Sequence, residues 1–148
     1  MTAKATKPQR SPPTYVLDKQ VGFMLRQVNQ RHTTLFASGM PSDVTPTQWA
    51  ALTKLAEVGP TSQNHLGRMT AMDVATIKGV VDRLTKRGFV RTRADARDAR
   101  RRLVMLTTEG TEFVTTHVAA ALTVTEQTLA PLEERERTLL LWLLTKMM

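Results

Sequence analysis

Hydrophobic side chains along most of the chain recur every three to four residues, the period of one face of an α-helix. The first such stretch covers residues 15–38 and stops at Gly39 and Pro41, so it predicts one long amphipathic helix. A second stretch begins at Pro46, which suits a first helical turn, and stops before Gly59.

Two shorter helices are predicted next, joined by a tight turn. The first covers residues 61–69 and begins at Thr61 or Ser62, because either hydroxyl is a good N-cap. The second begins after Asp73 and ends at Gly88, a residue suited to the position just past a helix. Its apolar positions share one face and are Ile77, Val80, Val81 and Leu84.

The hydrophobic period then changes from about 3.6 to 2, which is typical of strands. Residues 89–93 and 103–107 are the two strands, and the charged segment 94–102 connects them. Helical periodicity returns from residue 108 until Pro131 and again over residues 133–148. The expected class is mainly α (α+β): helices around one two-stranded ribbon.

Charge is concentrated in the middle of the chain. The 148 residues carry a formal net charge of +8. Between Arg83 and Arg102 nine arginines and lysines are opposed only by Asp95 and Asp98, so these twenty residues carry +7. A solvated helix face normally alternates acids and bases, and this segment does not, which favours a polyanionic partner.

Other functional classes find little support in the sequence. There is no cysteine, no apolar run near the ~20 residues of a membrane span, and no apolar core in the polar, proline-containing residues 1–14. We therefore expect a disordered arm at residues 1–14, no membrane and a cytoplasmic location. No phosphate-binding loop, catalytic triad context or metal-ligand spacing is present, so we expect no enzyme activity, no metal and no cofactor.

Two short helices followed by a ribbon with a cationic tip form the arrangement of a winged helix-turn-helix. The exposed face of the second helix then faces the major groove, where small or hydroxyl residues allow close approach and a lysine donates to guanine. The candidates for base contact are Ala75, Thr76, Lys78 and Gly79, and those for phosphate contact are Arg83, Lys86 and Arg87. Backbone N–H groups near Thr61, Ser62 and Gln63 are further phosphate donors.

The tip of the ribbon carries the most specific signal. An arginine there can enter a narrow minor groove, and Arg97, Arg100 and Arg101 are the candidates. Asp95 and Asp98 are expected to pair with loop arginines or to cap the turn, and so to hold the wing in shape.

These segments carry a family resemblance. The run Asp98-Ala-Arg-Arg-Arg-Leu-Val-Met-Leu-Thr-Thr-Glu-Gly110 resembles the wing of the MarR (multiple antibiotic resistance regulator) family. The run Asp73-Val-Ala-Thr-Ile-Lys-Gly-Val-Val-Asp-Arg-Leu-Thr-Lys-Arg-Gly-Phe-Val90 looks like its recognition helix, and Thr45-Pro-Thr-Gln-Trp-Ala-Ala-Leu52 like its second-helix entry. The family usually has arginine where this chain has Ala99. We therefore favour Arg100 as the leading wing arginine, with Arg97 next.

The resemblance implies a transcriptional regulator, usually a repressor, that works as a homodimer. Residues 45–107 are the expected winged helix-turn-helix, and residues 15–44 with 108–148 the helical dimerisation region. One protomer per half-site implies a pseudo-palindromic double-stranded operator with half-sites ~10 bp apart.

Regulators of this family commonly release DNA when a small aromatic acid or phenol binds between the dimer layer and the winged unit. The expected ligand contacts are Phe23, Arg26, Gln27, Gln30, His32, Trp49 and His117. For the two histidines and Trp49 a place in the core is the alternative reading, and a histidine could also respond to pH.

A second reading of the charge is a sequence-neutral architectural protein that binds DNA or RNA. The +7 segment would serve that purpose as well. However, aromatic residues do not interleave with the basic ones, as a stacking platform for single strands requires. The sequence therefore favours a reader of duplex DNA.

Overall fold

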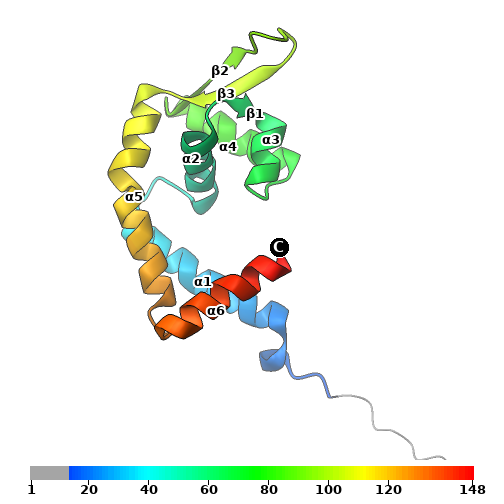
Figure 1. Ribbon diagram of the computed structural model, residues 1–148, viewed down its shortest axis with the longest axis vertical. Coiled ribbons are helices and arrows are strands. Elements are labelled where there is room, and N and C mark those ends of the chain that lie inside the picture. Colours follow the sequence, from blue (N-terminus) through cyan, green and yellow to red (C-terminus); the bar gives the residue numbers. More distant parts are fainter. Residues whose placement is uncertain (1–13) are drawn as a thin grey trace, which may run out of the picture.

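The computed structural model describes residues 14–148, so the predicted arm lies, apart from Thr14, outside the described residues. Helices dominate this part, and the sheet is small (Figure 1). In chain order the elements are η1 (Leu17–Lys19), α1 (Val21–Gly39), α2 (Pro46–Val58), β1 (Thr61–Ser62), α3 (Gln63–Met69), α4 (Val74–Lys86), β2 (Val90–Ala94), β3 (Arg102–Leu106), α5 (Thr108–Leu129) and α6 (Glu134–Met147).

The molecule has two parts, joined by α5 and by the segment between α1 and α2 (Figure 1). The elements from α2 to β3 form one part, which we call the winged unit. The other part, which we call the helical base, consists of α1, the second half of α5, and α6. This is the mainly α, winged helix-turn-helix class predicted from the sequence.

The winged unit has the main hydrophobic core. Helices α2, α3 and α4 and the sheet each contribute fully buried side chains, among them Leu52, Leu66, Ile77, Leu84 and Val104. The predicted inner face of α4 is confirmed, because Ile77, Val80, Val81 and Leu84 are all buried. Burial of such side chains contributes roughly 1.5–3 kcal/mol each relative to exposure, so α4 is firmly held from behind.

Side-chain caps define where the helices of the winged unit begin. Thr45 and Gln48 form a reciprocal capping box at α2. Asp73 caps α4 as predicted, with its Oδ1 accepting from the Thr76 N–H at 2.7 Å. Of the two predicted caps for α3, Ser62 is the one used, and its Oγ accepts from the His65 N–H.

The turn between α3 and α4 is tight because Gly67 has no side chain. A Cβ there would lie 3.0 Å from Ile77 Cγ2 and 3.1 Å from the Met72 carbonyl oxygen. The turn itself needs a left-handed residue, and Ala71 takes φ 53°. This packing sets how α4 crosses α3.

The sheet has one strand more than predicted, and the bounds of the two predicted strands are each shifted by one residue. Its order is β1-β3-β2, all antiparallel, whereas only the two-stranded ribbon was predicted. Thr61 therefore belongs to β1, opposite Val104, and does not begin a helix. Strand β2 lies one residue later than the predicted 89–93, and β3 lies one residue earlier than the predicted 103–107. Strand β3 ends early because Thr107 leaves the sheet to cap α5.

The long first helix predicted over residues 15–38 is wrong at its start. Gln20 takes an extended conformation (φ −91°, ψ 129°), which separates η1 from α1. Its side-chain amide donates to the Val16 carbonyl at 2.8 Å, and this contact replaces a helical turn. Apolar residues continue on both sides of the break, so periodicity alone does not reveal it.

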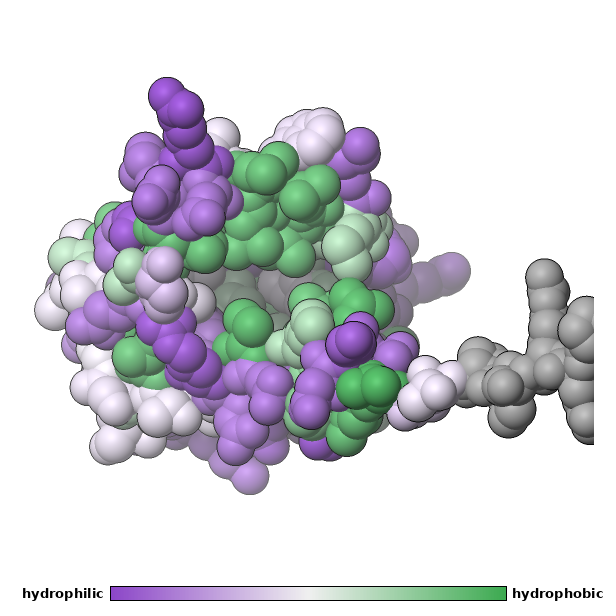
Figure 2. Space-filling model, turned by 90° about the horizontal axis from the view of Figure 1, so that it is seen from below, coloured by the Kyte–Doolittle hydropathy of each residue, from purple (hydrophilic) through white to green (hydrophobic). Residues whose placement is uncertain are grey.

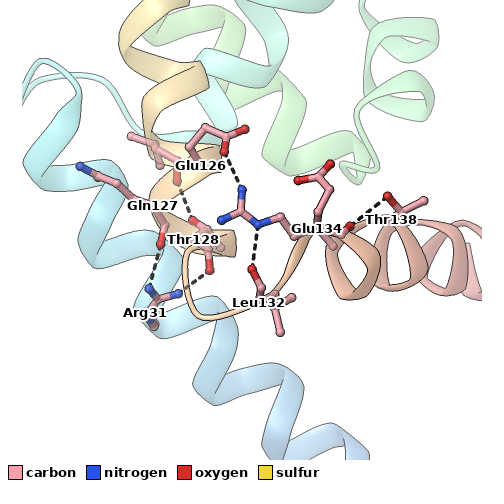
Figure 3. Close-up of polar contacts among 9 residues, drawn as sticks. Arg31, Glu126, Gln127, Thr128, Leu132, Glu134 and Thr138 are labelled. Atoms are coloured by element: carbon pink, nitrogen blue, oxygen red, sulfur yellow. Dashed lines mark hydrogen bonds and ion pairs between the residues drawn. The ribbon is translucent and has the colours of Figure 1, made fainter.

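Polar contacts tie the three helices of the base together (Figure 3). The Arg31 guanidinium on α1 donates to the carbonyl oxygens of Thr128 at 2.6 Å and Gln127 at 2.8 Å, both in the last turn of α5, where helical N–H donors run out. Arg137 on α6 donates to the Leu132 carbonyl and pairs with Glu126 at 2.9 Å.

The base leaves much apolar surface exposed within the described chain. Seen from the helical end, hydrophobic side chains lie on both sides of a hollow (Figure 2). No residue of α6 is buried, and Val21 on α1 is 63% exposed. Apolar residues that are exposed on α1 and α6 include Met24, Leu25, Val28, Leu139, Leu141, Trp142, Leu143 and Met147.

Candidate nucleic-acid interface

The outer face of α4 is fully presented to solvent at its first turn. Ala75, Thr76 and Lys78 are exposed, as the sequence analysis required of base-contacting residues. Val74, the first residue of the helix, is 67% exposed, and sequence reasoning missed it. Its isopropyl group is suited to contact with a thymine methyl, and its position directly after the Asp73 cap was the available signal.

Asp73 is an ionised cap at this exposed end. The hydrogen bond from the Thr76 backbone N–H, aided by the Thr76 side chain, holds the pKa of the Asp73 carboxyl below its usual value. The carboxylate is therefore fully charged near neutral pH, and it stabilises the positive end of the helix dipole.

Further along α4 the cations are arranged by contacts within the helix. Lys78 Nζ lies 2.9 Å from an Asp82 carboxylate oxygen. The Arg83 guanidinium folds back over Gly79, where a Cβ would lie 3.5 Å from Arg83 Nη2. Arg83 and Lys86 are exposed and make no ion pair within residues 14–148. Both are therefore available to phosphates.

Arg87 is placed differently from the phosphate contact predicted for it. Its guanidinium donates to the Asp43 backbone carbonyl at 2.7 Å and pairs with the Asp43 carboxylate. Arg87 follows the last turn of α4, and the side chain is only 24% exposed because it turns back toward the segment between α1 and α2.

A groove of about 460 Å³ joins the parts of the candidate interface. Gln63 from the start of α3, Lys86 from α4 and Arg102 from β3 all line it. Thr61, Ser62 and Gln63 are half-buried, and Ser62 already uses its hydroxyl as a cap. The helix-turn-helix and the ribbon thus border one surface.

The wing turn is built by its two aspartates. Asp95 Oδ1 accepts from the Arg97 N–H and Asp98 Oδ1 from the Arg100 N–H, both at 3.0 Å. The Asp95 N–H also donates to the Arg101 carbonyl oxygen at 2.8 Å. The carboxylates therefore bind backbone rather than guanidinium groups, and the turn is held without using its cations.

The arginines of the wing have no carboxylate partner among the described residues. Arg97, Arg100 and Arg101 are exposed, and none takes part in an ion pair within residues 14–148. Arg102 donates to Thr92 Oγ1 at 2.8 Å across the ribbon. Within the described residues, the tip therefore carries three arginines that have no carboxylate partner, on a turn held by its own backbone and its two aspartates.

Of the residues expected to bind a ligand, His32 and Trp49 line a cavity between α1, α2 and α5, which has a volume of about 280 Å³. His32 and Phe36 of α1, Trp49 and Thr53 of α2, and α5 enclose it. The α5 side, which sequence reasoning missed, is lined by Val118, Ala121, Leu122, Val124 and Thr125.

His32 has a defined hydrogen-bonding role in this cavity. Thr128 Oγ1 donates to the Val124 carbonyl at 2.8 Å, so it accepts from His32 Nδ1 at 2.9 Å. The tautomer that satisfies both contacts carries its proton on Nδ1, and His32 Nε2 has no hydrogen-bond partner within residues 14–148.

The other expected ligand residues lie elsewhere. Phe23 and Arg26 line a separate groove on α1, with Arg26 Cζ 5.7 Å from the Phe23 ring centroid. Gln27 and Gln30 are exposed on the same helix. His117 stacks on Phe113 with ring centroids 4.3 Å apart, and its Nδ1 donates to the Phe113 carbonyl.

Neither a metal centre nor a membrane span is found in the described part. Residues 14–148 contain no group of three or more His, Asp or Glu side chains arranged to hold a metal ion. None of the helices found there is long and apolar enough to cross a bilayer.

Comparison with known proteins decides the family. The MarR family profile matches residues 42–101, which span α2 to the wing turn. The transcriptional repressor NicR from Pseudomonas putida is 36% identical over 98% of this chain and 94% of its own length. The chain belongs to the MarR family.

Two solved structures have nearly the same fold as this chain. A probable transcriptional regulator from Pseudomonas aeruginosa is 52% identical, with a TM-score of 0.88 over 90% of this chain and 100% of that one. BpsR from Bordetella bronchiseptica, whose DNA binding is regulated by 6-hydroxynicotinic acid, is 35% identical. Its TM-score is 0.87 over 91% of this chain and 97% of that one. The relatives are transcriptional regulators, so this MarR-family protein is one too.

Proposed function

We propose that this protein is a homodimeric repressor that binds a pseudo-palindromic operator in double-stranded DNA and is released by a small aromatic ligand. The observation that carries the DNA-binding part is the shared groove between α3, α4 and the ribbon. It is lined by Asp82 and by Lys86 and Arg102, and these two cations form no ion pair within residues 14–148. In this arrangement Lys78, Thr76 and Val74 contact base edges, Arg83 and Lys86 contact phosphates, and the wing arginines reach the minor groove.

The exposed apolar surface of the base supports a dimer. Val21 and Val28 on α1 and Trp142 on α6 are each more than half exposed, which is unusual for one protomer alone. A second copy of the chain covers them in our proposal, and each winged unit then binds one half-site. The half-sites lie about one DNA turn, ~10 bp, apart.

The cavity beside His32 and Trp49 is our proposed ligand site. Its volume of about 280 Å³ and its largely apolar walls suit a ligand with one aromatic ring. The Thr53 and Thr125 hydroxyls donate to carbonyls of their own helices, and His32 Nδ1 donates to Thr128. What these three side chains offer a ligand is therefore hydrogen-bond acceptors, and the Trp49 indole N–H is the one side-chain donor in the lining.

This donor pattern defines the ligand more closely. His32 Nε2 accepts from a ring hydroxyl or ring N–H of the ligand. A hydroxylated aromatic acid supplies such a donor, and the effect of 6-hydroxynicotinic acid on BpsR supports this class.

The DNA-binding proposal is tested by titrating labelled duplex from the protein's own promoter, random duplex of equal length, and hairpin RNA at matched salt. We expect the promoter duplex to bind at least a hundredfold more tightly than the other two, as specific sites typically do. Equal affinity for all three would instead establish the sequence-neutral alternative.

The ligand proposal is tested by calorimetry with 6-hydroxynicotinic acid and with nicotinic acid, which lacks the ring donor. We expect the hydroxylated acid to bind more tightly and to release the operator. His32→Asn, which keeps a donor toward Thr128 but removes Nε2, should abolish the difference between the two acids. Exposed Thr33→Val on the same helix should leave it unchanged.

A further inference from the structure

The Arg87 side chain is held on three sides at the end of the recognition helix. Its guanidinium binds both the backbone carbonyl and the carboxylate of Asp43. The same planar group lies over the Phe89 ring, with Cζ 4.6 Å from the centroid, and 6.0 Å from that of Phe113. A two-point contact combined with stacking fixes a guanidinium far better than a single ion pair does.

Asp43 lies at the joint between the two parts of the molecule. It belongs to the segment between α1 of the base and α2 of the winged unit. Met40 and Val44, on either side of it, are buried, so this segment is anchored against its surroundings. The contact between Arg87 and Asp43 therefore ties the end of α4 to the point where the winged unit joins the base.

Aromatic side chains connect the same point to the proposed ligand cavity. Trp49, which lines the cavity, meets Phe113 edge-on with ring centroids 6.5 Å apart. Phe113 stacks on Phe89 at 4.6 Å, and Phe89 carries the Arg87 guanidinium. Packed side chains that rest on one another transmit a displacement, because protein interiors have few voids to absorb it.

We propose that Arg87 and Asp43 form a latch that positions the recognition helix relative to the base and couples the ligand cavity to operator affinity. The inference rests on the proposed function. Arg87 and Asp43 are positioning residues, and neither contacts DNA. A ligand that displaces Trp49 shifts Phe113 and Phe89, and thereby loosens Arg87 from Asp43. The two recognition helices then lose the spacing that fits the operator.

The decisive variant is Asp43→Asn, compared with Glu57→Gln. Each removes one negative charge from an exposed ion pair, but Glu57 pairs with Lys54 within α2, away from the joint. Relative to Glu57→Gln, we expect Asp43→Asn to weaken operator binding by about tenfold, within the usual range of coupling between sites. The salt dependence should stay unchanged, because no phosphate contact is lost. Equal operator affinity of the two variants would overturn the latch.

Two further measurements separate a latch from a phosphate anchor and from simple destabilisation. If Arg87 binds phosphate, Arg87→Gln lowers the salt slope by about one unit and Asp43→Asn does not weaken binding, and both results would overturn the proposal. The charge-swapped variant Asp43→Arg/Arg87→Asp should recover part of the lost affinity. Thermal unfolding should show all variants folded at the assay temperature.

Coupling to the cavity is read from the response to 6-hydroxynicotinic acid. We expect wild type to lose operator affinity when the acid is added, and Asp43→Asn to lose severalfold less, since its latch is already open. A full wild-type response in Asp43→Asn would overturn the coupling. Absence of duplex binding by wild type would overturn the proposed function and the latch with it, a result distinct from failure of the variant alone.

The position of the winged units relative to each other can be measured with spin labels, because the chain has no cysteine of its own. Ala99→Cys on the wing turn accepts one spin label per protomer, which gives a single distance between the wings of a dimer. We expect Asp43→Asn to broaden this distribution and Glu57→Gln to leave it narrow. A mere loss of stability would not move it.

Discussion

Lys78 and Asp82 pair with each other one turn apart on the exposed face of α4, with Nζ 2.9 Å from the carboxylate oxygen. Their side chains are 66% and 54% exposed, so the pair is weak, of the order of a few tenths of a kcal/mol. DNA can therefore take Lys78 from Asp82 at little cost. The acid lowers the attraction of this face for phosphates in general without preventing a base contact.

Asp82→Asn should raise affinity for random duplex more than affinity for the operator. The variant leaves Lys78 free for any phosphate, so the ratio of operator to random binding falls. Fluorescence anisotropy with both duplexes at one salt concentration measures this ratio. An unchanged ratio would show that the pair plays no part in discrimination.

Lys78→Ala should cost about 1–3 kcal/mol at the operator and relax preference at one base pair. The reason is loss of a donor to guanine acceptors in the major groove. Competition with operators mutated at single positions identifies that base pair. Lys86→Ala is the matched control, and it should weaken all duplexes alike because Lys86 is expected to contact phosphate.

Gly79→Ala should stabilise the free protein and weaken operator binding at once. Alanine favours a helix interior over glycine by about 0.8–1 kcal/mol, and the new Cβ would contact only the flexible Arg83 end at 3.5 Å. The same methyl group would stand between α4 and the base edges. Chemical denaturation tests the expected gain in stability, and operator titration tests the expected loss of affinity.

The comparison variant for Gly79 is Gly22→Ala in α1, where a Cβ would meet nothing within 4 Å. It should stabilise the protein without changing operator affinity. A Gly79→Ala protein that binds the operator as wild type does would exclude close approach of the helix at this point.

Arg100→Ala should weaken operator binding and reduce the slope of log affinity against log salt by about one unit. Parallel Arg97→Ala and Arg101→Ala variants rank the three arginines of the turn, and we expect the largest effect at Arg100 and the next at Arg97. Arg135→Ala on α6 removes the same charge far from the ribbon and should leave the slope unchanged.

Asp73 should make the stability of the protein depend on acid. Its pKa is lowered in the folded state, so its contribution is present above the usual carboxyl pKa of about 3.9 and is lost as pH falls through the folded value. Asp73→Ala should therefore unfold more easily than wild type at pH 7, and the difference in stability should disappear as pH falls through the folded pKa of Asp73. In Asp73→Asn the side chain still caps the helix but does not titrate, so the contribution of the cap to stability should stay the same over this pH range.

Features determined by local sequence were predicted well. The start of α4 at Asp73, its end before Gly88, and its buried face follow from capping chemistry and a 3.6-residue period, which need no distant partner. The order of helices and ribbon follows for the same reason. The resemblance of three segments to MarR-family motifs predicted the family and supported the winged helix-turn-helix fold.

Features that depend on distant pairing were missed. Strand β1 is two residues long and exists only because β3, some forty residues later, lies beside it. One wall of the proposed ligand cavity comes from α5, whose approach to α1 depends on Gly39, where a Cβ would lie 2.7 Å from Val124 Cγ2. Helical periodicity therefore grouped Phe23 and Arg26 with His32, although they line different cavities.

The short strand β1 has a consequence for how such a protein adapts to new operators. Because β1 joins the start of α3 to β3, the wing and the helix-turn-helix form one sheet-linked body and keep a fixed separation. In the proposed dimer, adjustment to half-sites at another distance then has to come from the helical base, and adjustment to another sequence from the face of α4. Engineering the two properties separately, by exchanging either the base or the α4 face between relatives, follows directly from this division of the chain.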